Sequence, residues 1–345
     1  MESLNFRSDT QTLPTQEMLE AIRSAPLGDD VFGEDPTVNR LEAMAAEKMG
    51  KPAAMLVISG TMGNLVALMT HAKALGGEVL VDSEAHIFYY EGGGLCSIAG
   101  WTPMPLVSHA GMLDPDEVAA AIRKPNIHYP SPGLLCLENT HNRSGGRVTP
   151  LDLHKRLCNV AHERGLAVHL DGARIFNAAI AAGVSAADYA ADVDSIQFCL
   201  SKGLSCPLGS VLAGSREFID KARFHRKRVG GGMRQAGIIA AAGIVALEKM
   251  IDRLADDHAN ARLLAKGISK IPSLKVDMAS VETNMVNVNH TGTGLSTAEV
   301  VAKLKAAGVL VGERPPKAFR MVVNRHTGKS EVEQAIQRMK TALAG

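Results

Sequence analysis

A carboxylate and an amine each follow a strand-like run in the middle of this 345-residue chain. Asp171 ends the run 166–170, and Lys202 follows the run 193–200. A buried carboxylate keeps a pyridine nitrogen protonated, and a lysine in a dry pocket can hold an aldehyde, so the pair suits pyridoxal phosphate. Either residue alone has a simpler explanation, a helix cap for Asp171 or a solvated turn for Lys202. Together they predict a site for this cofactor.

A candidate phosphate cradle lies upstream of this pair. The apolar run 55–58 turns through Ser59, Gly60 and Thr61 into a helical pattern over 65–69. A strand that turns into a helix in this way points backbone N–H groups and a hydroxyl at a phosphate, and the helix dipole adds attraction. The same three residues would also suit an ordinary capped turn, so this prediction depends on the other motifs.

His86 follows the strand-like run 79–81. Ligands of open α/β sheets bind beyond the carboxyl ends of strands, where an imidazole can stack on a flat ring and move protons near neutral pH. As one of twelve histidines, His86 could equally be a surface or packing residue.

Apolar runs alternate with helical stretches between about residues 40 and 245, which predicts an α/β fold with a mainly parallel sheet covered by helices. The expected strands are 54–58, 78–81, 133–137, 167–170, 195–199 and 209–213. A long helix over 235–257 would lead to a small α+β domain with a strand at 284–289 and helices at 297–307 and 330–343. The expected division is an arm over 1–35, a large domain over 36–245 and a small domain over 246–345.

Composition is typical of an ordinary soluble enzyme. The chain is 46% hydrophobic with a net charge of +1, so nothing favours nucleic acid or a membrane as a partner. We expect no signal peptide and no membrane span, and therefore a cytoplasmic location. The five cysteines form no paired motif, and we interpret them as reduced packing thiols rather than disulfides or metal ligands.

Eight stretches of the chain resemble the threonine aldolases, which are fold-type I pyridoxal phosphate enzymes of the β-eliminating lyase group. They occur in family order and cover 6–10, 28–37, 59–64, 84–87, 137–142, 169–174, 200–204 and 230–235. The resemblance implies a large domain of the aspartate-aminotransferase type and a small C-terminal domain. One departure is Phe32, where the family commonly has tyrosine, so any hydroxyl contact from that loop is lost.

For the cofactor, the resemblance implies Lys202 as the covalent anchor, Asp171 at the ring nitrogen and His86 stacked on the ring. Further contacts are implied for Ser59, Gly60, Thr61, Arg174, Lys227 and Arg234. The last two would reach the phosphate of a neighbouring subunit, although a solvated basic turn explains Lys227 equally well. No metal is expected.

For the substrate carboxylate, the resemblance implies Ser8, Arg174 and Arg320. An arginine fork gives bidentate, charge-assisted bonds that fix the orientation of an amino acid. The segment 322–327 departs from the family pattern, which leaves Arg314 or Arg325 as substitutes for Arg320.

The implied reaction is the reversible aldol cleavage of L-threonine and L-allo-threonine to glycine and acetaldehyde, as in low-specificity L-threonine aldolases. A base must take the proton of the β-hydroxyl while the Cα–Cβ bond breaks. The family places His86 and His128 near that hydroxyl, and the sequence leaves open whether one of them or an ordered water is the base. It also leaves open the preference between the two substrates.

Three other functions fit parts of the pattern. Another pyridoxal phosphate enzyme of the β-eliminating or decarboxylating kind would keep Lys202 and Asp171 but break a different bond. A nicotinamide dehydrogenase needs a Gly-x-Gly-x-x-Gly turn after a strand, and residues 60–63 have the wrong spacing. A non-catalytic amino-acid-binding protein would have no need of Lys202.

Residues 1–35 hold family motifs but little regular pattern, so we expect this arm to pack across a subunit interface. In fold-type I enzymes a neighbouring subunit completes the active site. The resemblance therefore implies at least a homodimer, and we expect a homotetramer.

Overall fold

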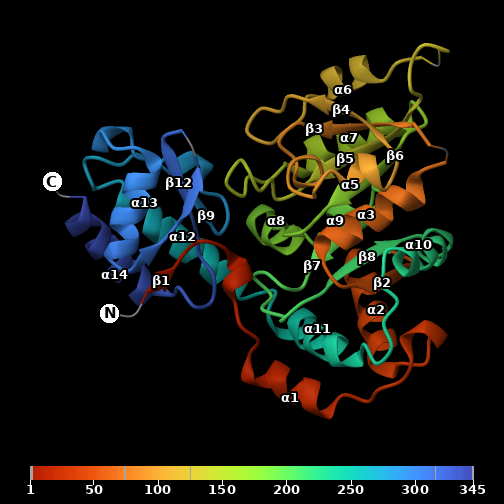
Figure 1. The fold of residues 1–345 in the computed structure, drawn as a ribbon, viewed down its shortest axis with the longest axis horizontal. Coiled ribbons are helices and arrows are strands. Elements are labelled where there is room, and N and C mark those ends of the chain that lie inside the picture. Colours follow the sequence, from red (N-terminus) through yellow and green to blue (C-terminus); the bar gives the residue numbers. More distant parts are fainter. Residues whose placement is uncertain (1–2, 74, 125, 315, 344–345) are drawn as a thin grey trace.

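A seven-stranded sheet forms the centre of the large domain in the computed structural model, which describes residues 3–73, 75–124, 126–314 and 316–343 (Figure 1). In spatial order its strands are β2 (Ala53–Val57), β8 (Ser210–Gly214), β7 (Ser195–Cys199), β6 (Ala167–Asp171), β5 (Pro132–Glu138), β3 (Glu78–Asp82) and β4 (Thr102–Leu106). β8 runs antiparallel to both neighbours, and all other pairs are parallel. The predicted α/β fold with a mainly parallel sheet is confirmed.

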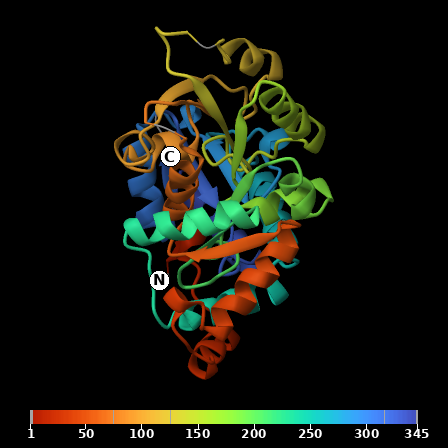
Figure 2. The same ribbon diagram turned by 90° about the vertical axis from the view of Figure 1, so that its right-hand side faces the viewer.

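Helices cover both faces of this sheet, which explains why its central strands are apolar on both sides. One face packs against α3 (Gly60–His71) and α10 (Arg216–Arg228), and Figure 2 is turned so that α10 lies toward the viewer. The main core lies on the other face, under α2 (Pro36–Met49), α7 (Leu151–His162), α8 (Ile175–Ala182) and α11 (Gly237–Lys249).

All six strands predicted for the large domain are present, and the sheet has one further strand, the edge strand β4, which was not predicted. Its sequence is Thr-Pro-Met-Pro-Leu, and proline is tolerated only where a strand has no partner on one side. The single helix predicted over 235–257 is wrong. α11 ends at Lys249, a tight turn follows, and α12 (Leu254–Ile268) begins in a new direction.

The small domain has its own core around a three-stranded antiparallel sheet. Its strands in spatial order are β11 (Gly312–Arg314), β12 (Ala318–Val322) and β9 (Met285–Asn289), and its helices are α12, α13 (Thr297–Ala306) and α14 (Lys329–Ala342). The predicted strand at 284–289 and both predicted helices are confirmed. Apart from Phe6 of the N-terminal arm, the buried residues of the second core begin at Ala261, within α12. The expected boundary between 245 and 246 lies inside the continuous helix α11.

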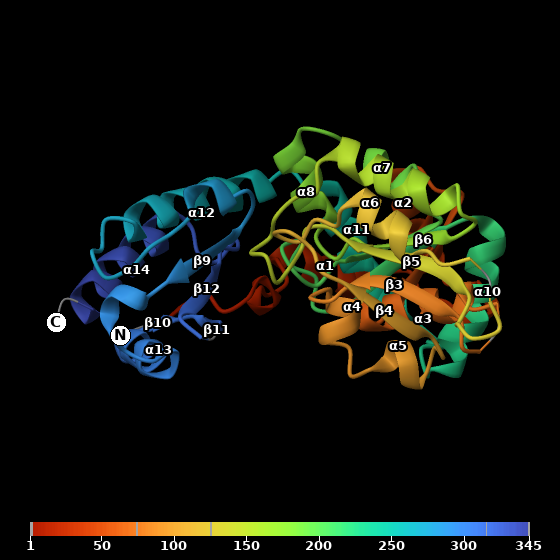
Figure 3. The ribbon, with the colours of Figure 1, turned by 90° about the horizontal axis from the view of Figure 1, so that it is seen from above.

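The N-terminal arm joins the two domains of its own chain. β1 (Leu4–Asn5) pairs with β10 (Val309–Leu310), and Phe6 is fully buried in the small-domain core. The arm then crosses to α1 (Gln16–Ser24), which packs on α11 (Figure 3). The outermost residues of the expected arm and small domain, 1–2 and 344–345, lie outside the described residues.

Among the residues that the structure describes, no helix is both long and apolar enough to span a membrane.

Candidate active site

Asp171 lies at the carboxyl end of β6 and is only 2% exposed. Its Oδ1 accepts hydrogen bonds from Gln197 Nε2 at 2.5 Å and from the backbone N of Ala173 at 3.1 Å, and its Oδ2 accepts one from Asn64 Nδ2 at 2.9 Å. These three donors fix the carboxylate in one orientation. A buried and rigidly held carboxylate suits the ring nitrogen of pyridoxal phosphate.

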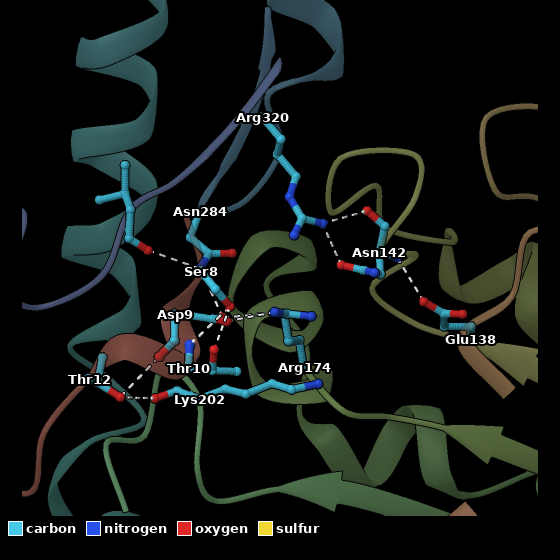
Figure 4. Close-up of polar contacts among 11 residues, drawn as sticks. Ser8, Asp9, Thr10, Thr12, Glu138, Asn142, Arg174, Lys202, Asn284 and Arg320 are labelled. Carbon is cyan, nitrogen blue, oxygen red and sulfur yellow. Dashed lines mark hydrogen bonds and ion pairs between the residues drawn. The ribbon is translucent and has the colours of Figure 1, made fainter. Parts of the chain in front are cut away.

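Lys202 follows β7, the neighbour of β6, at the same edge of the sheet. Its side chain is half-buried and extends below Arg174 in Figure 4, and its backbone oxygen accepts a bond from Thr12 Oγ1 at 2.8 Å. The structure therefore brings Asp171 and Lys202 to one edge, as their positions after two strands predict.

His86 begins the short helix α4 (His86–Tyr89), beyond the end of β3. Its backbone N donates to Glu138 Oε2 at 2.6 Å, and its Nδ1 lies 2.8 Å from Glu91 Oε1. Burial lowers the pKa of His86, but Glu91 and Asp171 outweigh burial and raise that pKa above its ordinary value. The imidazole is thus held beside two carboxylates at the edge that carries Asp171.

The predicted cradle is the start of α3. Ser59 caps the helix by accepting a bond from the backbone N of Met62 at 3.2 Å. A Cβ added to Gly60 would lie 2.8 Å from Cys199 Sγ, so a side chain at this position would force Cys199 or the first turn of the helix to move. With Thr61 exposed beside it, this helix start has the free N–H groups that bind phosphate.

Arg174 is tied to the N-terminal arm. Its Nε and Nη2 donate to the two carboxylate oxygens of Asp9, at 2.7 and 2.6 Å. Asp9 is fully buried, which by itself would raise its pKa, but Arg174 and Lys202 lower the pKa to about 2. Asn284 of the small domain also donates to Asp9, at 3.3 Å, while Ser8 caps the turn that presents it (Figure 4).

Three arginines, Arg314, Arg320 and Arg325, were considered for the substrate carboxylate. The charge of Arg174 acts on Arg320. Burial and the positive charges of Arg174 and Arg314 lower its pKa to about 10. Its Nη1 donates to Asn142 Oδ1 at 2.7 Å, and the backbone N of Asn142 donates to Glu138 (Figure 4). Arg325 instead donates to the backbone oxygen of Leu13.

Arg314 lies toward a different group of residues. The charges that act on it come from Arg143, Tyr90 and Glu84, and burial lowers its pKa. Arg143 itself bonds Glu84 and the Tyr90 hydroxyl and lies over the Tyr89 ring. Arg314 therefore joins an aromatic and ionic cluster beside the small-domain sheet.

His128 does not lie with His86 in this chain. Its loop precedes β5, and the neighbouring backbone N of Glu78, the first residue of β3, donates to Ser131 O at 2.8 Å. Arg123 pairs with Glu78 and stacks on Tyr129, which holds the loop at the amino edge. β5 spans seven residues, about 20 Å, so His86 and His128 of the same chain lie at opposite edges of the sheet.

The glycine turn 230–232 lies beside the cradle of its own chain, because a Cβ on Gly231 would meet Met62 Sδ at 2.6 Å. Lys227 is exposed next to this turn, and Arg234 Nη1 pairs with Asp29 Oδ2 at 2.9 Å. The basic run also contains a buried member, Arg226, which pairs with Asp30 at 2.7 Å. Phe32, near Asp29, is 72% exposed.

Several residues that shape this site had no role predicted from the sequence. Four of them, Asp9, Asn64, Glu138 and Asn142, lie within the eight stretches that resemble the threonine aldolases, whereas Glu91 and Asn284 lie outside those stretches. The only sequence feature that could have identified them is a polar residue at the end of a strand or in a glycine-rich segment. Sequence spacing gave no indication of which partner each residue contacts.

Comparison with known proteins gives a consistent result. Residues 5–291 match the family described as beta-eliminating lyase. Low-specificity L-threonine aldolase 1 of Arabidopsis thaliana is 42% identical over 99% of this chain and 97% of its own length. The low specificity L-threonine aldolase of Escherichia coli K12 is 41% identical over 99% of each chain. The solved threonine aldolase of Leishmania major, at 18% identity, superposes with a TM-score of 0.85 over 98% of this chain and 99% of that one, which shows a shared fold.

Proposed function

The chain belongs to the beta-eliminating lyase family and, within it, to the threonine aldolases, and we propose that its active site cleaves L-threonine and L-allo-threonine to glycine and acetaldehyde. It is an aldehyde-lyase that breaks the Cα–Cβ bond of β-hydroxy-α-amino acids, in a reversible reaction. The observation that carries the proposal is the identity of 41% to 42%, over nearly the whole chain, with relatives named low-specificity L-threonine aldolases.

The side chains at the sheet edge fit pyridoxal phosphate. Asp171 would pair with the ring nitrogen, Lys202 would anchor the aldehyde, and His86 would cover the ring. Ser59, Gly60 and Thr61 would receive the phosphate at the start of α3, where Gly60 leaves no room for a side chain. When bound, the cofactor supplies the electron sink that weakens bonds at the substrate's Cα.

Arg174, Arg320 and Ser8 would hold the substrate carboxylate. Asp9 occupies Nε and Nη2 of Arg174, and Asn142 occupies Nη1 of Arg320, so each guanidinium keeps N–H groups for a ligand. A carboxylate held at two points sets the rotation about Cα. This orientation decides which bond at Cα breaks, because that bond must lie perpendicular to the conjugated system.

The proton of the β-hydroxyl would pass to His86, to His128 or to a water that they hold. Because His128 lies at the amino edge of the sheet, it would enter the site of another copy of the chain. Ile127, beside it, is 96% exposed, as expected of a residue that a second copy covers. Lys227 and Arg234 would act at a neighbour's phosphate in the same assembly, which we take to be a homotetramer or at least a homodimer.

The five cysteines are free, as is usual for proteins of a reducing compartment, and this supports a cytoplasmic location for the enzyme.

The nearest alternative is another lyase of this family that releases ammonia. Incubation with L-threonine and with L-allo-threonine, followed by assay of acetaldehyde, glycine and ammonia, separates the two. We expect acetaldehyde and glycine in equal amounts from both substrates. Ammonia with a keto acid, and no acetaldehyde, would overturn the proposal.

A further inference from the structure

Glu91 is a buried carboxylate to which no role has been given. Its side chain is 4% exposed, and a single oxygen, Oε1, accepts two hydrogen bonds. One comes from His86 Nδ1 at 2.8 Å and the other from Asn64 Nδ2 at 2.9 Å. The carboxylate therefore contacts the two residues that lie next to the expected cofactor ring and its nitrogen.

Asn64 extends this contact to Asp171. Its amide nitrogen donates one hydrogen to Glu91 and the other to Asp171 Oδ2, both at 2.9 Å. Its oxygen lies 3.1 Å from His169 Nε2, and His169 Nδ1 lies 2.8 Å from Ser195 Oγ. Both ends of the amide have partners, so the amide can adopt only one orientation. Glu91 and Asp171 are thus joined through one rigid side chain.

We infer that Glu91 is a positioning residue, which orients the imidazole of His86 and, through Asn64, the carboxylate of Asp171. This role rests on the proposed function in one respect, because it assumes that His86 and Asp171 contact the cofactor. By accepting at Nδ1, Glu91 leaves Nε2 of His86 as the free ring nitrogen. Among the described residues none hydrogen-bonds Nε2.

The charges that act on His86 come from three sides. Glu91 and Asp171 favour its protonated form, while Lys202 and burial oppose it. Burial likewise raises the pKa of Glu91, and Asp171 adds to that effect, whereas His86 and Asn64 act against it. Without the Glu91 charge, Asp171 remains to oppose the effects of burial and Lys202. The pKa of His86 should then fall.

The test compares Glu91→Gln with the wild type by NMR of the full chain with ¹³C-labelled histidine, before and after pyridoxal phosphate is added. Glutamine can keep both hydrogen bonds at the position of Oε1 but carries no charge. His86→Asn identifies the His86 signal. We expect this signal to titrate at lower pH in Glu91→Gln than in the wild type. An unchanged or higher midpoint would overturn the inference.

Glu84→Gln is the matched control. Glu84 lies two residues before His86, on the other side of α4, and bonds a cation, Arg143, but its side chain is half exposed. We expect it to leave the His86 titration unchanged, and an equal fall in both variants would contradict a specific role for Glu91.

Two further variants separate charge from orientation and guard against failure to fold. Glu91→Asp keeps the charge on a shorter side chain, so we expect the His86 midpoint to stay above its ordinary value. Glu91→Ala removes both bonds, and we expect binding of pyridoxal phosphate to weaken by about tenfold. Unchanged binding in Glu91→Ala would overturn the positioning role. Neither the His86 titration nor the binding of pyridoxal phosphate requires that threonine be the substrate. The role of Glu91 can therefore fail while the aldolase activity is found, and the aldolase activity can be absent while the role of Glu91 is found.

Discussion

Arg174 and Asp9 form a two-bond ion pair between the large domain and the N-terminal arm, with N–O distances of 2.7 and 2.6 Å. Asn284 of the small domain donates to the same carboxylate. Three segments far apart in sequence therefore meet at one buried charge. Because Arg174 is also proposed to bind the substrate, this pair links the integrity of the fold to recognition of the amino acid.

Asp9→Asn should destabilise the protein by about 3 kcal/mol at pH 7, because it leaves the buried Arg174 without a negative partner. The folded-state pKa of Asp9 is lowered from 3.8 to about 2, so its stabilisation is complete above pH 3.8 and is lost as the pH falls through about 2. Urea unfolding at pH 7 and at pH 2 to 3 measures this. We expect the difference from wild type to shrink in acid. A difference that stays constant with pH would contradict the ion pair as its cause.

Asn142→Ala should raise KM for threonine by about tenfold and change kcat little, since Asn142 holds Nη1 of Arg320 in place. Arg325→Lys is the control, because Arg325 bonds the backbone of the arm instead. Steady-state kinetics with both variants checks the choice of Arg320. If Arg325→Lys raised KM and Asn142→Ala did not, Arg325 would be the carboxylate ligand.

Mixed oligomers should show that His128 acts in another copy. Lys202→Ala should be inactive alone, and His128→Asn should have much lower activity than the wild type. When the two are unfolded and refolded together at equal amounts, about a quarter of the sites combine an intact Lys202 with a neighbour's intact His128. We expect activity to recover to about that fraction of wild type. No recovery in a mixture shown to contain hybrid oligomers would mean that both residues serve the site of one chain.

Gly60→Ala should weaken binding of pyridoxal phosphate by about tenfold, because the new Cβ would meet Cys199 Sγ at 2.8 Å and displace the start of α3. Cys199→Ala in the same chain removes the obstacle and should restore part of the affinity. Equilibrium titration of the apoprotein measures both. Failure of the second substitution to help would show that the loss has another cause than this contact.

The sequence predicts the parts of this site that depend on strand order. Asp171 and Lys202 each follow an apolar strand, and parallel strands bring their carboxyl ends to one edge, so their meeting could be expected. Glycine and a cap before an apolar helix likewise identify the start of α3. These features are local, and the six large-domain strands that carry them match the structure within about one residue.

Other parts of the site depend on contacts that local pattern does not encode. Asp9 meets Arg174 across 165 residues, and Arg320 meets Asn142 across 178. The position of His128 at the amino edge follows from the direction of β5, although family resemblance suggested a place beside His86. The two prolines of β4 conceal an edge strand, and no proline or glycine marks the turn between α11 and α12.

Reduction of the protein with borohydride in the presence of pyridoxal phosphate, followed by peptide mass mapping, tests whether Lys202 holds the cofactor. We expect one pyridoxyl group per chain, on Lys202, and none in Lys202→Ala. A group on a different lysine, such as Lys227, or no incorporation at all, would show that Lys202 is not the anchor.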